Sequence, residues 1–165
     1  MSRNTPTLHL LCGKIAAGKS TLAHRLAEEP QTVLLSEDVL LAHLYPGELQ
    51  SLQDYVTYSA RLRDALGPHV EQLLQSSLSV VLDFSANTLG QRRWMCGLLD
   101  NVNAAHVLHF LDVADDVCKA RLRQRNATGA HPFAPSEADF DVITEYFVPP
   151  SAEEGFTVQV YGEEG

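Results

Sequence analysis

The residues best suited to chemistry lie between Gly13 and Ser20, which read G-K-I-A-A-G-K-S and match the phosphate-loop pattern G-x-x-x-x-G-K-[ST]. The glycines of this pattern allow a tight turn that points backbone N–H groups at an anion. Its lysine brings a positive charge to the β- and γ-phosphates, and its serine hydroxyl is an oxygen ligand for Mg²⁺. The residues predicted to bind the nucleotide here are Gly13, Lys14, Ala16, Ala17, Gly18, Lys19, Ser20 and Thr21.

Two aspartates at the ends of predicted strands are candidates for the remaining chemistry. Asp38 follows the apolar stretch 31–35, and Asp83 ends the apolar stretch 79–83. Parallel sheets build their sites at the carboxyl ends of strands, so we expect both aspartates beside the phosphate loop. One carboxylate can accept the proton of an acceptor hydroxyl, while the other holds Mg²⁺ or positions the acceptor. Glu37 is a rival for the base, and Asp38 is also suited to cap the following helix.

Arg121 and Arg125 are candidates for closing over a bound triphosphate. They lie four residues apart, hence on one helical face, and Arg125 adjoins a stretch rich in Gly and Pro at 126–135. The alternative is a solvated basic face, because further basic residues lie on the same helix. We predict a lid over residues 121–136 that contributes both arginines to nucleotide binding.

Strand and helix patterns alternate along the chain in an order that can position these residues. The helix that begins at Lys19 points the positive end of its dipole at the phosphates. We expect strands at 8–12, 31–35, 79–83, 106–111 and 156–161, and further helices that begin near Val39, Leu49, Pro68, Gly90, Asp115 and Ser136. Such alternation implies an α/β fold with a five-stranded parallel sheet and helices on both faces.

The stretch 42–78, between the second and third strands, is longer than a crossover needs. Its residues 49–66 have the apolar spacing of an amphipathic helix, and Gly67-Pro68 is expected to interrupt it before a second helix. We interpret this stretch as a helical insertion that grips the acceptor substrate.

Length and composition favour one domain over residues 1–165, with a formal net charge of −9. Proteins that grip long nucleic acids carry a basic face, so this charge argues against such a partner. No run of 18 apolar residues and no apolar N-terminal signal region occur, which predicts a cytoplasmic protein without a membrane segment. The histidines and cysteines lack the spacing of metal ligands. Nothing in the sequence indicates an oligomeric state.

In their order, these motifs resemble those of the P-loop phosphotransferases grouped with phage polynucleotide 5′-kinase, zeta toxins and chloramphenicol phosphotransferase. The shared pattern is G-x-x-x-x-G-K-S-T, then S-x-D, an Asp-ended third strand followed by Asn, and R-x-x-x-R before a lid. In this chain the corresponding residues are Gly13–Thr21, Ser36-Glu37-Asp38, Asp83 with Asn87, and Arg121 with Arg125.

The resemblance implies an adenylate-kinase-like P-loop NTPase fold with the first strand central and with ATP and Mg²⁺ as cofactors. By the same resemblance, Asp38 is the general base, Asp83 is a carboxylate of the acceptor or metal site, and Arg125 is the lid arginine. The chain departs from polynucleotide kinases at Leu41, where those enzymes carry an arginine that contacts the acceptor.

From the motifs and the resemblance we predict a kinase that moves the γ-phosphoryl group of ATP·Mg²⁺ to a hydroxyl of a small molecule. Lys19, Asp38 and Arg125 are the predicted catalytic residues, and Ser20 and Asp83 the predicted metal ligands. One alternative is a kinase of polynucleotide or nucleoside 5′-hydroxyls. A second, from another class, is a nucleotide-binding switch or ATPase regulator, which should carry a water-orienting residue and switch loops near the γ-phosphate.

Overall fold

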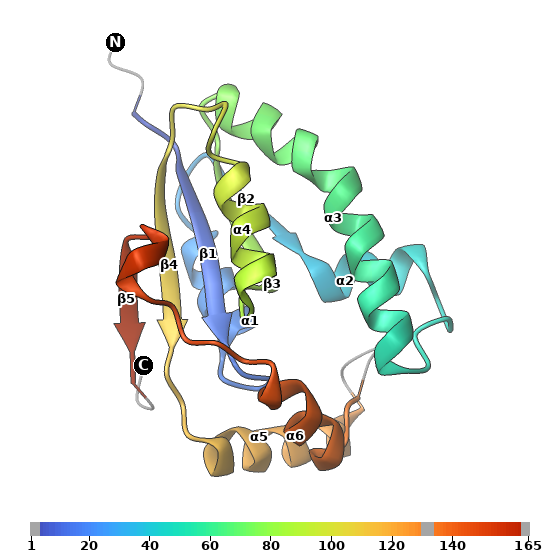
Figure 1. Ribbon diagram of the computed structural model, residues 1–165. Helices are drawn as coiled ribbons and strands as arrows, with labels where there is room; N and C mark the ends of the chain where they lie inside the picture. The colour runs from blue at the N-terminus through green and yellow to red at the C-terminus, as the bar shows by residue number, and fades with distance from the viewer. Residues whose placement is uncertain (1–3, 130–133, 163–165) are drawn as a thin grey trace.

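The computed structural model describes residues 4–129 and 134–162 (Figure 1). Strands and helices alternate from end to end of this part of the chain. In order they are β1 (Thr7–Gly13), α1 (Lys19–Leu26), β2 (Thr32–Ser36), α2 (Glu37–Leu44), α3 (Leu52–Gln75), β3 (Ser79–Ser85), α4 (Leu89–Gly97), β4 (Ala105–Leu111), α5 (Asp115–Thr128), α6 (Glu137–Glu145), the 3₁₀ helix η1 (Ala152–Glu154) and β5 (Val158–Tyr161).

The strands form one sheet in the order β2-β3-β1-β4-β5, and every neighbouring pair is parallel. β1 is central, with Leu10 beside Leu82 of β3 on one side and Leu108 of β4 on the other. All three of these leucines are fully buried, as expected for parallel strands that are covered on both faces. The predicted α/β class and five-stranded parallel sheet are confirmed.

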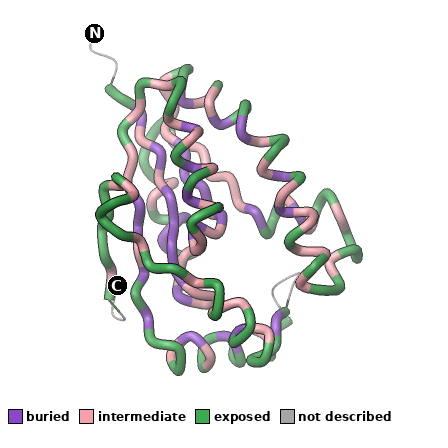
Figure 2. The backbone as a smooth tube through the Cα atoms, in the orientation of Figure 1, coloured by how far each residue is buried: buried purple, intermediate pink, exposed green. Residues whose placement is uncertain are grey.

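Helices cover both faces of this sheet, and the alternation of side chains along β1 divides the core in two. One cluster joins Leu10 to residues of α2, α3 and α4, among them Leu41 and Val70. The other joins Leu11 to residues of α1, α5 and α6, among them Leu122 and Phe140. Figure 2 shows the buried residues concentrated along the central strands and the inner faces of the helices. The carboxyl ends of the strands are therefore held on a rigid support.

The insertion between β2 and β3 differs from the sequence prediction. The break expected at Gly67-Pro68 is wrong, because α3 runs without interruption through both residues. Proline fixes a φ that a helix tolerates, and tertiary packing offsets the hydrogen bond it removes. Gly67 packs against Leu98, which directly follows α4: a Cβ atom at Gly67 would be in ordinary contact with Leu98 Cδ2, at 3.6 Å. The result is one long helix that lies along the sheet and reaches past its carboxyl edge (Figure 1).

The boundaries near the predicted lid also shift. α5 continues to Thr128 and ends at Gly129, whose φ of 63° is left-handed, so Arg125 lies in the last helical turn and not at the start of a loop. Residues 130–133 of the predicted lid lie outside the described residues. The predicted capping box of α6 is confirmed: Ser136 and Asp139 each accept a hydrogen bond from the other's backbone N–H. No helix within the described ranges is long and apolar enough to cross a membrane.

Candidate active site

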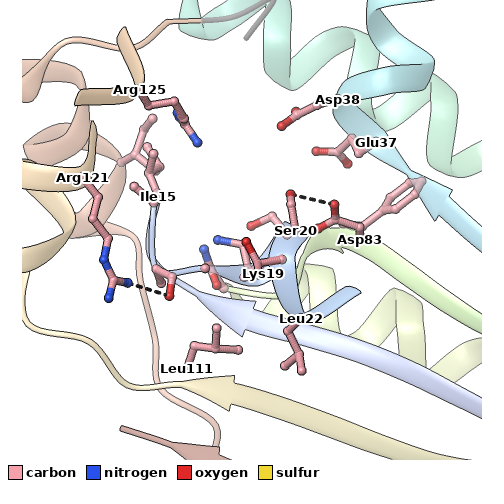
Figure 3. Close-up of a pocket in the computed structure, with 18 of the residues that line it drawn as sticks. Ile15, Lys19, Ser20, Leu22, Glu37, Asp38, Asp83, Leu111, Arg121 and Arg125 are labelled. Carbon is pink, nitrogen blue, oxygen red and sulfur yellow. Dashed lines mark hydrogen bonds between the residues drawn. The ribbon is translucent and has the colours of Figure 1, made fainter. Parts of the chain in front are cut away.

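A cavity of about 550 Å³ opens at the carboxyl edge of the sheet, where the loops after β1, β2 and β3 meet α5 (Figure 3). The phosphate loop contributes residues 15–21 to its lining. Three carboxylates, those of Glu37, Asp38 and Asp83, line one side, and Arg121 and Arg125 line the opposite side. The fold thus brings together groups that are spread over about a hundred residues of sequence.

The phosphate loop has the backbone that its motif requires. Gly18 has a φ of 106°, which side chains rarely allow, and it immediately precedes α1. At Gly13 a Cβ atom would lie 3.2 Å from both the Cβ of Ala17 and the carbonyl oxygen of Leu111, so this position has no room for a side chain. The N-terminus of α1 therefore faces the cavity with its backbone N–H groups and the positive end of its dipole.

Lys19 lies inside the curve of this loop. Its Nζ donates to the carbonyl oxygens of Gly13 at 2.5 Å and Lys14 at 2.9 Å. Burial lowers the pKa of the Lys19 ammonium, and the nearby Asp83 carboxylate acts against this shift. The charge is thus held where the motif needs it, within reach of an anion in the loop.

The Lys14 side chain contacts α5 and the Phe147 ring. Its Nζ forms an ion pair with Asp115 of α5 at 2.5 Å and lies 5.7 Å from the centre of the Phe147 ring. Neither Gly13 nor Lys14 lines the cavity, whereas the other six predicted nucleotide-binding residues of the loop do. The Lys14 side chain links the loop to α5 instead.

Asn87, which the resemblance includes but the predicted site residues do not, clamps the start of the loop. Its Oδ1 accepts from the N–H of Gly13 at 2.9 Å, and its Nδ2 donates to the carbonyl oxygen of Gly13 at 2.8 Å. Its own backbone N–H donates to Gln91 of α4, and its carbonyl oxygen accepts from Val148. The loops after β1 and β3 are thereby held in one arrangement.

The two predicted metal ligands are in direct contact. Ser20 Oγ donates to Asp83 Oδ2 at 2.8 Å, across the end of β3 (Figure 3). Burial raises the pKa of Asp83, while the hydrogen bond from Ser20 and the charge of Lys19 act in the opposite direction. A hydroxyl and a carboxylate oxygen at this separation suit Mg²⁺, which takes few protein ligands beside phosphate oxygens.

Asp38 lies within the first turn of α2 and lines the cavity. The alternative reading of Asp38 as the helix cap is wrong, because α2 begins at Glu37 and its N-cap is Ser36. A negative charge in this first turn is favoured by the helix dipole. The Asp38 side chain faces Arg125 across the cavity, as Figure 3 shows.

Glu37, the rival base, is almost fully enclosed, with an exposed fraction of 3%. The hydroxyl of Tyr55, on α3, donates to its Oε1. Burial raises the pKa of Glu37 to about 7; the charges of Asp38 and Asp83 add to the shift, and the Tyr55 hydrogen bond and the charge of Arg63 oppose it. Sequence reasoning missed Tyr55, because a tyrosine at helical spacing is indistinguishable from a core residue.

The two arginines project from α5 toward the phosphate loop. Arg121 Nη1 donates to the carbonyl oxygen of Ala17 at 3.2 Å, so this side chain rests on the loop itself. Arg125 lies one turn further, and burial lowers the pKa of its guanidinium while the Asp38 charge opposes the shift. Both predicted lid arginines therefore lie at the cavity, and both come from α5.

Comparisons with known proteins agree with this geometry. The family described as AAA domain matches residues 8–150. Among solved structures, a provisionally assigned kinase from Chloroflexus aurantiacus is 24% identical, with a TM-score of 0.76 over 98% of this chain and 87% of that one. A sugar kinase from Janibacter sp. is 17% identical, with a TM-score of 0.65 over the same shares of the two chains. Kti12 of Chaetomium thermophilum, solved with ADP-AlF3, is 16% identical, with a TM-score of 0.68 over 94% and 88%.

No curated protein shows a significant sequence match to this chain. Identities below 25% establish a shared fold, and that fold is the one the resemblance implied, with β1 central in the sheet. The family match spans the strand of the phosphate loop, both candidate aspartates and the arginine helix. The chain therefore belongs to the AAA domain family and has the fold of the P-loop kinases.

Proposed function

We propose that this protein is an ATP-dependent phosphotransferase that moves the γ-phosphoryl group of ATP to a hydroxyl of a small-molecule acceptor. One observation carries the proposal: a single cavity joins a phosphate loop, with Lys19 inside it, to a carboxylate wall that faces two arginines. Phosphoryl transfer needs positioned phosphates, neutralised charge and an oriented acceptor, and this arrangement offers a group for each.

The residues divide the work by their position. The phosphate loop and Lys19 hold the β- and γ-phosphates, and Arg125 offsets the charge that develops on the transferring group. Ser20 and Asp83 would hold Mg²⁺, which when bound neutralises phosphate charge. Asp38 accepts the proton of the acceptor hydroxyl while the oxygen of that hydroxyl bonds to the γ-phosphorus. The bond from that phosphorus to the β–γ bridging oxygen breaks, and ADP leaves with the bonding electrons.

A small acceptor is favoured over a polynucleotide end by charge and by Leu41. The net charge of −9 and the three carboxylates beside the acceptor position disfavour a polyanion. Leu41, at the position of the acceptor-contacting arginine of polynucleotide kinases, is fully buried in the core and cannot contact a ligand. A small-molecule acceptor is also in keeping with the sugar kinase among the structural neighbours.

The test is transfer of labelled γ-phosphate from ATP to pooled metabolites, nucleosides and oligonucleotides, with Asp38→Asn compared to wild type. If Asp38 is the base, transfer should fall by about 10²–10⁴-fold while ATP affinity stays within a few-fold. Asp64→Asn, at an exposed position of α3 away from the cavity, is the matched control.

Three results separate the alternatives in this assay. Transfer by Asp38→Asn within a factor of two of wild type would remove the base assignment. Phosphate release with no phosphorylated acceptor would favour a switch or ATPase regulator. Wild-type protein that does not bind ATP·Mg²⁺ in a calorimetric titration would end the proposal as a whole.

A further inference from the structure

We infer that Glu37, anchored by Tyr55, selects the acceptor: its second carboxyl oxygen binds a hydroxyl or ammonium group next to the hydroxyl that receives the phosphoryl group. The inference rests on the proposed phosphotransfer and names the class of acceptor for that same cavity. The expected acceptors are vicinal diols and 1,2-amino alcohols without a phosphate group.

The two carboxyl oxygens of Glu37 differ in their hydrogen bonding. Oε1 accepts from the Tyr55 hydroxyl, whereas Oε2 is buried and has no hydrogen-bond partner within residues 4–129 and 134–162. Buried polar atoms are nearly always paired, so an unpaired carboxyl oxygen at a cavity calls for an explanation. A ligand in the cavity that supplies the missing partner would gain the full benefit of pairing it.

Glu37 lies directly beside the proposed base, Asp38. Glu37 and Asp38 are consecutive residues of the first turn of α2, and both line the cavity. Figure 3 shows the two carboxyl groups side by side on the wall that faces Arg125. An acceptor whose reactive hydroxyl meets Asp38 therefore presents a neighbouring group to Glu37. A second polar group on the carbon next to the reactive hydroxyl is the group that such an acceptor would offer to Glu37.

The Glu37 side chain is held in place by a residue of another helix. Tyr55 comes from α3, and its hydroxyl holds the Glu37 side chain between two helices. A fixed acceptor oxygen discriminates more strongly than a mobile one, because an acceptor that lacks the partner group leaves it unpaired. The long helix of the insertion thus has a definite task at the acceptor end.

The acceptor end of the cavity is acidic. Glu37, Asp38 and Asp83 gather at the acceptor end, with Arg63 near enough to Glu37 to affect it electrostatically. A phosphate on the acceptor would meet these carboxylates, whereas a neutral polyol or a cationic amino alcohol would not be repelled.

The experiment measures kcat/KM for labelled phosphate transfer to paired acceptors. The probes are glycerol with propan-1-ol, ethane-1,2-diol with ethanol, and 2-aminoethanol with ethanol; a 5′-hydroxyl oligonucleotide completes the set. In wild type, at least one acceptor with the neighbouring group should exceed its analogue by about 10²-fold or more. In Glu37→Met that ratio should fall to within a few-fold of one, because the group that reads the difference is gone.

Three further variants separate recognition by Glu37 from a purely structural effect. Tyr55→Phe frees Glu37 and should lower the ratio in part, while Tyr58→Phe, on the same helix but stacked on Tyr45, should leave it unchanged. In Glu37→Gln the amide oxygen can accept from Tyr55 and the amide N–H₂ then faces the acceptor. This variant should keep ethane-1,2-diol within a few-fold and reject 2-aminoethanol, which tells a diol from an amino alcohol.

The outcomes are distinct from those that test phosphotransfer itself. The inference is overturned if Glu37→Met keeps the wild-type ratio. Equal transfer to the two members of every pair, transfer to the oligonucleotide alone, or no transfer to any diol or amino alcohol by protein that binds ATP would also overturn it. Transfer to the oligonucleotide that depends on Asp38 would leave phosphotransfer standing. Protein that does not bind ATP at all refutes the proposed function instead.

Discussion

Glu37 should make the protein less stable as the pH rises from about 4.5 to about 7. Its pKa is raised from 4.5 to about 7 in the folded state, first by burial and further by the charges of Asp38 and Asp83. Between these values the folded protein holds a proton that the unfolded chain has lost, so the free energy of unfolding decreases with pH. The contribution is fully present below pH 4.5 and is lost above about pH 7.

The size of the effect follows from the shift. A difference of about 2.5 pH units, at about 1.4 kcal/mol per unit, corresponds to roughly 3 kcal/mol. This is a large part of the stability of an ordinary domain, which is about 5–15 kcal/mol. Burial and the charges of Asp38 and Asp83 raise the pKa, while Tyr55 and Arg63 lower it, so the figure is the net result of these opposing effects.

The perturbation is Glu37→Gln, which keeps the size of the side chain and an oxygen for the Tyr55 hydroxyl. Urea unfolding of both proteins at intervals from pH 4.5 to 8.5 gives the difference in the free energy of unfolding. The free energy of unfolding of the variant, minus that of wild type, should increase by roughly 3 kcal/mol from the lowest to the highest pH. Glu48→Gln, at an exposed position, should show no such trend. A difference that stays constant with pH, or that changes in favour of wild type, would refute the reasoning.

Three further predictions concern other parts of the site and its support. Lys19→Ala should fold normally yet lose at least about 10²-fold in ATP turnover, measured by phosphate release, because a phosphate-facing charge is removed. Asn87→Ala should weaken ATP binding about 10-fold in a calorimetric titration, since both hydrogen bonds to Gly13 are lost. Glu154→Gln should lower the free energy of unfolding by roughly 3–5 kcal/mol in urea, because it leaves the fully buried Arg92, paired at 2.6 Å, without its countercharge. The exposed Glu153→Gln is the control, and an equal loss in both variants would contradict the ion-pair explanation.

The features that were predicted from the sequence are those that neighbouring residues decide. The phosphate loop needs two glycines, a lysine and a serine at set spacing, so its conformation and the start of α1 could be predicted locally. The same is true of the Ser136 capping box, which involves two residues three apart. Continuous apolar runs marked the buried strands, and their alternation with helices was enough to predict a parallel sheet.

Two features depend on long-range packing: the continuity of α3, which was predicted incorrectly, and the ion pair of Lys14, which was not anticipated. Gly67-Pro68 was expected to interrupt the helix before a second one, but α3 runs through both residues, and its neighbours Leu62, Val70 and Leu74 are packed into the core. Lys14 remains a predicted nucleotide-binding residue of the loop, and its side chain forms an ion pair with Asp115 of α5, 101 residues along the chain. Local propensity has no access to either partner.

The acceptor end of the cavity shows the same division. The sequence by itself was enough to place Asp38 just after one strand and Asp83 near the end of another, with both strands ending at the edge that carries the phosphate loop. Only the tertiary structure decided that α3 carries Tyr55 back to Glu37, 18 residues away, and buries that carboxyl, one oxygen of which has no hydrogen-bond partner among the described residues. The physical reason is that burial and pairing depend on which helices cover a side chain, and that is set by the packing of the whole sheet and not by the residues next to it.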